Sequence, residues 1–175
     1  MTEFRIGDQR AGLIQNADVI INASPAATDH QAAAEGALRA RDYGTAIARL
    51  KEHLAAEPAD SLARFRLVVA ALRGRHPDRY EAGQIHRLTA RLVRLAADDP
   101  GCHHAKVLAV VINDGMLSRS RTSPLPPSAD TLRLVAAVVR TAPGRAREIV
   151  EHVPVPESPT WAELRRALGA APPRS

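Results

Sequence analysis

The apolar residues of this chain recur at helical spacing over most of its length. Ala46, Ile47, Leu50 and Leu54 share one helical face, because steps of one, three and four positions separate them. Apolar faces with similar spacing occupy residues 62–72, 85–95, 105–117, 132–139 and 149–150. The pattern predicts an all-α fold from about residue 29 onward.

Helix boundaries are marked by residues that cap or break helices. We expect the first helix to begin at Thr28 or Asp29, and a later one at Ser128 or Asp130, because these side chains cap helix N-termini. Ser158 followed by proline predicts the start of a last short helix. These signals predict a helical-hairpin domain over residues 29–152, an exposed loop at 118–127 and a tail over 153–175 that contains one short helix.

A repeated motif carries a resemblance to a known family. The first copy is Asp42-Tyr43 followed by Ala46, Leu50, Leu54 and Pro58, and a weaker copy begins at Asp78-Arg79-Tyr80-Glu81-Ala82. Ala46 and Ala82 are 36 positions apart, near the 34-residue period of tetratricopeptide repeats. Over residues 29–100 the chain resembles that family. The resemblance implies stacked helical hairpins whose concave groove binds peptides or partner helices.

Three arginines are candidates for binding a partner in such a groove. If the helices near residues 29–41 and 60–73 are the inner helices of two hairpins, Arg39, Arg66 and Arg73 face the concave side. Arginines there would hold an acidic peptide or a terminal carboxylate. The alternative is that they lie on a solvated helix face.

The first 22 residues differ from the rest of the chain. They contain no proline and are rich in isoleucine, valine, glutamine and asparagine, a composition that suits self-stacking strands. Ile6, Gln9, Ile14, Gln15 and Asn16 form a pattern that resembles the amyloid-type signalling motifs of bacterial and fungal innate-immunity proteins. The resemblance implies a homo-oligomer. A β-hairpin packed on the helices and an unstructured leader remain open as alternatives.

Composition adds a second functional hypothesis. The net charge is +5, and 22 of the 24 basic residues are arginine. Arginine suits phosphate contacts, which would fit a nucleic-acid-binding regulatory protein. The 33 alanines indicate instead a general bias toward arginine and alanine, and five aromatic residues are too few for base-stacking platforms. We therefore rank nucleic acid below a protein partner.

Reactive residues form no known catalytic or metal-binding motif. Asp98, Asp99, Cys102, His103 and His104 lie close in sequence, but these residue types are also ordinary in a turn between helices. No second ligand spacing and no glycine-rich phosphate loop accompany them. The sequence therefore predicts a non-enzymatic adaptor without metal or cofactor. The arginine–serine loop at 118–122 is either a phosphorylation or docking segment or merely solvated.

Localisation rests on what the sequence lacks. No run of about 18 apolar residues occurs, so we expect no membrane span, and residues 1–5 do not resemble a signal peptide. The single cysteine excludes an internal disulfide and suits a reducing cytoplasm.

Overall fold

The computed structural model describes residues 25–119 and 125–169. Within these ranges the fold is all-α, as the sequence predicted, and contains no strand. The elements are α1 (Pro25–Arg39), α2 (Tyr43–Ala56), α3 (Ser61–Ala71), a 3-10 turn η1 (Pro77–Arg79), α4 (Ala82–Asp98), α5 (His103–Arg119), α6 (Ala129–Thr141), α7 (Pro143–His152) and α8 (Pro159–Ala167). The extended segment predicted for residues 1–22 lies outside the described residues.

Polar side chains fix where several helices begin. The carboxylate of Asp42 accepts a hydrogen bond from the Thr45 amide at the start of α2, and Asp60 caps α3 in the same way. The predicted caps Ser128 and Ser158 are confirmed, and each hydroxyl accepts an amide hydrogen bond from the third residue that follows it. These bonds satisfy amides that have no partner within the helix.

One predicted boundary was wrong. The first helix begins at Pro25 rather than at Thr28 or Asp29, because the fixed φ of proline suits the first helical position. Helix α4 begins at Ala82, since the backbone of Tyr80 is extended after the 3-10 turn.

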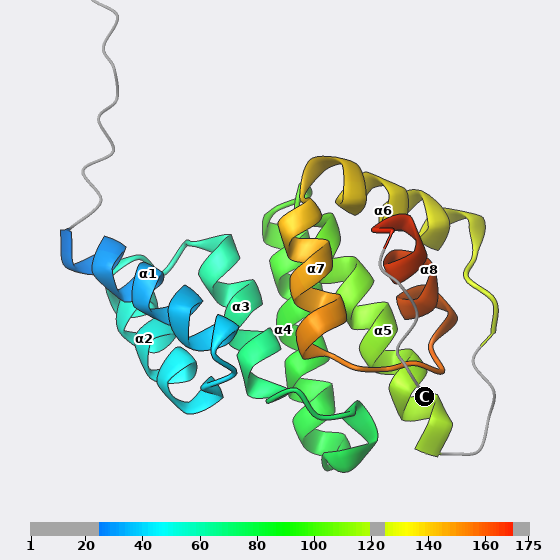
Figure 1. Ribbon diagram of the computed structural model, residues 1–175, viewed down its shortest axis with the longest axis horizontal. Helices are drawn as coiled ribbons and strands as arrows, with labels where there is room; N and C mark the ends of the chain where they lie inside the picture. Colours follow the sequence, from blue (N-terminus) through cyan, green and yellow to red (C-terminus); the bar gives the residue numbers. More distant parts are fainter. Residues whose placement is uncertain (1–24, 120–124, 170–175) are drawn as a thin grey trace, which may run out of the picture.

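The described residues bury two apolar cores that meet at α3. The smaller core joins α1, α2 and one side of α3, and consists of Ala34, Ala37, Leu38, Ala46, Leu50, Ala63 and Ala70. The larger core extends from α3 to α8 and is centred on Phe65, Leu92, Leu108, Ile112 and Ile149. Figure 1 shows α1 and α2 at one end of the molecule, with α3 between them and the remaining helices.

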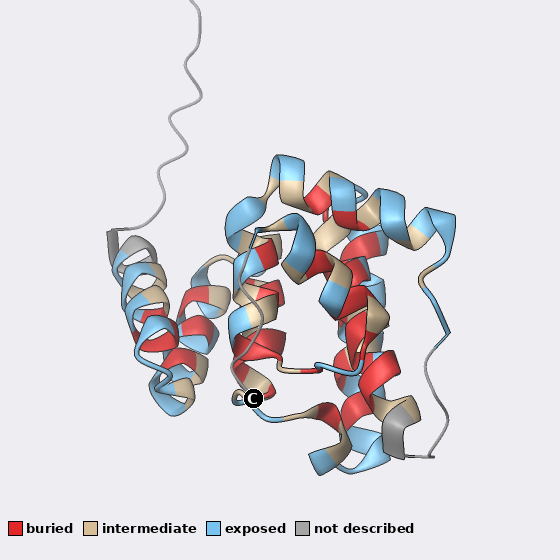
Figure 2. Cartoon of the chain, turned by 45° about the vertical axis from the view of Figure 1, so that its right-hand side comes forward, coloured by how far each residue is buried: buried red, intermediate tan, exposed pale blue. Residues whose placement is uncertain are grey.

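The residues that follow α7 belong to the larger core. Val153, Val155 and Leu164 are fully buried, and α8 packs against α5, α6 and α7. The Ser158 hydroxyl donates a hydrogen bond to a buried Asp114 carboxylate on α5, with 2.6 Å between the oxygens. Figure 2 shows buried positions on the inward sides of the helices around α5. None of the described helices combines the length and the apolar character needed to span a membrane.

Candidate functional site

Helix α3 directs two charged side chains into two separate hollows. Arg64 and Arg66 are two residues apart, so they leave the helix about 200° apart around its axis. Arg66 lines a hollow between α1 and α7, whereas Arg64 lines a hollow between α2 and α4. The two hollows differ in how far their charges are already neutralised.

The first hollow, which we call the ionic pocket, has a volume of about 260 Å³. The Arg66 guanidinium is 5 % exposed and donates to Glu148 of α7, at 2.9 Å from Nη2 to Oε1, and to Glu35 of α1. Burial alone would lower the pKa of Arg66, but the two carboxylates raise it above its ordinary value. Arg145 also donates to Glu148, at 2.6 Å. The charges of this pocket therefore join α1, α3 and α7 to one another.

A second contact fastens the end of α7 to the start of α2. The Tyr43 hydroxyl lies 3.2 Å from Nδ1 of His152, and the two rings meet edge to face. Burial lowers the pKa of His152, so the imidazole is neutral at pH 7. The backbone of Gly74 closes over Tyr43 with a φ of +64°. On this side of α3, the ionic pocket is thus bordered by α7 of the same chain.

The second hollow, which we call the basic groove, has a volume of about 380 Å³. Lys51 of α2 lies on one side, and Arg91 and Arg94 of α4 lie on the other. Its apolar lining comes from Leu67 of α3 and Leu95 of α4.

Most cations of the basic groove have no ion-pair partner among the described residues. Arg64 donates to the Pro58 carbonyl and to the Asp98 carboxylate, at 2.7 and 3.2 Å. Lys51, Arg91 and Arg94 are exposed and form no ion pair with any described residue. Four cationic side chains thus share a groove with one carboxylate, so the groove is strongly positive.

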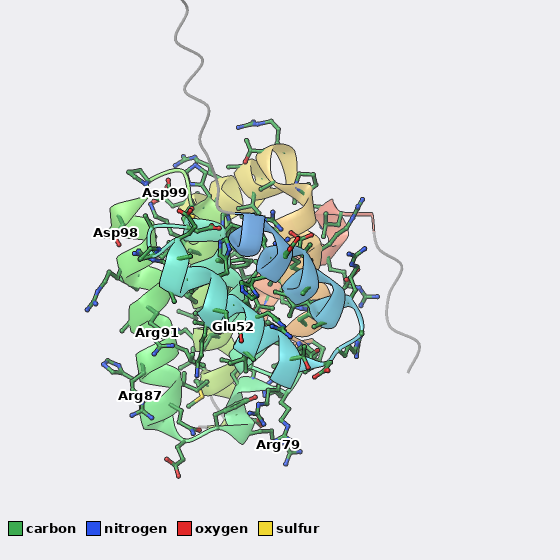
Figure 3. All side chains as sticks on the ribbon, turned by 90° about the vertical axis from the view of Figure 1, so that its left-hand side faces the viewer. Glu52, Arg79, Arg87, Arg91, Asp98 and Asp99 are labelled. Atoms are coloured by element: carbon green, nitrogen blue, oxygen red, sulfur yellow. The ribbon has the colours of Figure 1, made fainter. Side chains whose placement is uncertain are left out.

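The positive surface continues along α4 beyond the groove. A smaller hollow of about 190 Å³ shares Arg91 with the basic groove and adds Arg87, Gln84 and Tyr80. Figure 3 shows Arg87 and Arg91 on α4, with Asp98 at the end of the same helix. Arg87, Arg91 and Arg94 fall on one helical face, because their spacings are four and three residues.

The three arginines singled out from the sequence fall in different surroundings. Arg39 and Arg66 both line the ionic pocket, where Arg66 is held by two carboxylates and Arg39 is exposed. Arg73 is also exposed but follows the end of α3, outside that pocket. Their predicted role in binding a partner stays a prediction. The self-association residues Ile6, Gln9, Ile14, Gln15 and Asn16 lie outside the described residues.

The basic groove was not anticipated from the sequence. The spacing of Arg87, Arg91 and Arg94 was visible, and it marks one charged face of an amphipathic helix. The contribution of Lys51 and Arg64 was not visible, because only the packing of α2, α3 and α4 places them beside that face.

Cys102 and His104, near the start of α5, are held in neutral forms. Cys102 is buried, and burial raises the pKa of its thiol. The hydrogen bond between the Cys102 thiol and the Asp99 carboxyl lowers the pKa of Asp99. Burial and the nearby Arg145 lower the pKa of His104 to about 4. The thiol is therefore protonated at neutral pH and lacks the thiolate that a nucleophile needs. Among the residues that the structure describes, no His, Cys, Asp and Glu side chains are grouped to hold a metal ion.

Comparison with known proteins found no relative of this chain. The chain matches no family model, and no curated protein or solved structure is similar to it.

Proposed function

We propose that this chain is a non-enzymatic interaction module, an adaptor that binds a negatively charged partner protein through the basic groove. One observation carries the proposal: Lys51, Arg91 and Arg94 are exposed around a hollow and have no counter-ions among the described residues. Placing these like charges together is unfavourable unless solvent or a partner compensates them. An acidic partner supplies that compensation.

The hydrogen bonds of the buried polar side chains support a binding protein rather than an enzyme. The buried polar side chains Arg66, His152, Asp114 and Ser158 all bond to groups on other helices or at a helix start. Such groups hold helices together, and Cys102 and His104 are held in neutral forms. Stacked helical hairpins of the tetratricopeptide kind, which the sequence resembles, present grooves of this sort to partner proteins.

A nucleic-acid partner is the second candidate, and the same cations favour it. Phosphates would be bound with a steep loss of affinity as salt rises. The only described aromatic residue at the positive surface is Tyr80, whose hydroxyl donates to the Leu72 carbonyl at 2.5 Å. A single aromatic ring gives little base stacking, so the protein partner is preferred.

Binding of labelled poly-glutamate, followed by fluorescence anisotropy, tests the proposed function. The groove variant Arg91→Glu/Arg94→Glu reverses two exposed charges, and the control variant Arg140→Glu/Arg147→Glu makes the same charge change at exposed sites outside the groove. We expect the groove variant to lose binding at least tenfold, because reversal replaces attraction by repulsion at about 0.7 kcal/mol or more per site. Equal losses in the two variants, or no binding by the wild type, would contradict the proposal.

A further inference from the structure

The chemistry of the basic groove defines the kind of segment that fits it, and this inference rests on the proposed function. The cations stand at the sides of the groove, with Lys51 on α2 and with Arg91 and Arg94 on α4. Leu67 of α3 and Leu95 of α4 line the same groove. A partner that filled the groove would therefore meet apolar surface in addition to positive charge.

The apolar part of the groove is continuous with the protein interior. Leu95 belongs to the larger core and is only 3 % exposed, so the apolar surface open to a partner comes mainly from the half-buried Leu67, which packs against the smaller core. The groove thus lies where the two cores meet beside α3. An apolar side chain of a partner would extend this packing, and covering such a position removes apolar surface from water.

The dimensions suit a short segment. Arg91 and Asp98, which both line the groove, are seven residues apart on α4, which is about 10 Å along the helix axis. An extended peptide covers that distance with about three residues. Alternate side chains of such a peptide lie on opposite sides, so apolar residues can face Leu67 and Leu95 while neighbouring carboxylates reach the arginines.

We propose that the occupant of the basic groove is a short acidic segment of a partner protein whose carboxylates flank apolar side chains. The carboxylates pair with Lys51, Arg91 and Arg94, and arginine forms two parallel hydrogen bonds with a carboxylate. The apolar side chains contact Leu67 and Leu95. Affinity then depends on both parts of the segment, whereas a purely electrostatic site would respond to charge alone.

The experiment compares labelled peptides of equal charge by fluorescence anisotropy on the full chain. One probe of about ten residues contains leucines that are each flanked by glutamates, and its counterpart has serines in place of the leucines. A single-stranded DNA of about ten nucleotides is the third probe. Each probe is titrated with the wild type, with Arg91→Glu/Arg94→Glu and with the control Arg140→Glu/Arg147→Glu. Far-UV circular dichroism and the urea midpoint verify that each variant is folded.

We expect the leucine peptide to bind the wild type at least fivefold more tightly than the serine peptide, since partial burial of leucine contributes about 1 kcal/mol or more. We also expect the groove variant to bind the leucine peptide at least tenfold more weakly, whereas the control changes less than about threefold.

Each remaining outcome overturns a defined part of the account. Equal affinity for the two peptides, with both lost in the groove variant, refutes the apolar contribution and leaves the proposed function standing. If the DNA binds more tightly than both peptides and the groove variant loses that binding, the proposed acidic segment is refuted and the groove is assigned to nucleic acid. If no probe distinguishes the groove variant from its control, the proposed function itself fails.

Discussion

Replacing Arg66 with methionine removes the guanidinium that joins α1, α3 and α7. Arg66 is 5 % exposed, and its partners Glu148 and Glu35 have side chains that are 18 % and 38 % exposed. Breaking a buried ion pair by removing one partner costs about 3–5 kcal/mol. Both carboxylates reach the ionic pocket, and Glu148 keeps Arg145, so we expect a cost at or just below the lower end of this range, about 2–3 kcal/mol of unfolding free energy.

Urea unfolding followed by two probes measures this cost and locates it. Circular dichroism reports all helices, whereas the fluorescence of Trp161 reports the larger core, to which that residue belongs. Because Arg66 ties α1 to the rest of the chain, we expect helical signal to be lost at lower urea than fluorescence in the variant. Arg145→Met is the matched control, since Arg145 bonds only to Glu148 in the same network, and should cost less than about 1.5 kcal/mol.

Two results would refute this reasoning. A change below about 0.5 kcal/mol for Arg66→Met would mean that the network contributes nothing net to stability. Equal costs for Arg66→Met and Arg145→Met would mean that the link to α1 is irrelevant. A double-mutant cycle with Glu148→Gln isolates the pair, and we expect a coupling energy of about 1–3 kcal/mol.

The remaining predictions concern stability. Gly74→Ala should cost about 1–3 kcal/mol in urea unfolding, because φ is +64° and the new methyl group would lie 2.6 Å from the Tyr43 hydroxyl; a neutral result would contradict the close approach. Gly36→Ala in α1 should instead raise stability by about 0.5–1 kcal/mol, because the added Cβ would have no heavy atom within 4 Å outside the backbone of its own helix. Ser158→Ala removes the cap of α8 and a buried bond, and should lower the urea midpoint by the equivalent of about 1–3 kcal/mol, with Trp161 fluorescence as the readout. His104 has a folded pKa of about 4, below its ordinary 6.5, so its contribution is fully present above pH 6.5 and is lost as pH falls toward 4. The urea midpoint of His104→Gln should therefore change less between pH 7 and pH 5 than that of the wild type, and an unchanged pH dependence would contradict the assignment.

The helices could be predicted well because apolar spacing and capping residues lie within each helix or next to it in the sequence. The apolar face of α4, through Ile85, Leu88, Leu92 and Leu95, repeats at three and four residues and is buried as that spacing requires. Ser158 and the proline after it specify the start of α8 without reference to the rest of the fold. The start of α1 was misjudged because a proline can end one segment or begin the next, and the sequence alone does not distinguish these uses.

The candidate site was harder to predict because it depends on distant residues. Glu148, which holds Arg66, is 82 positions away in the sequence, so nothing near Arg66 indicates that its charge is already compensated. Lys51 and Arg91 line one groove although they belong to α2 and α4. The basic face of α4 is visible in the sequence, whereas the resemblance to tetratricopeptide repeats implies binding residues on the inner helices.

The most direct test of the central claim is to map the bound peptide by NMR. The ¹⁵N-labelled chain is titrated with the leucine-containing acidic peptide, and amide shifts are followed residue by residue. The account predicts that the largest shifts cluster around Lys51, Leu67, Arg91, Arg94 and Leu95, with few at the ionic pocket. Shifts centred on Arg39 and His152 instead, or no shifts at saturating peptide, would contradict it.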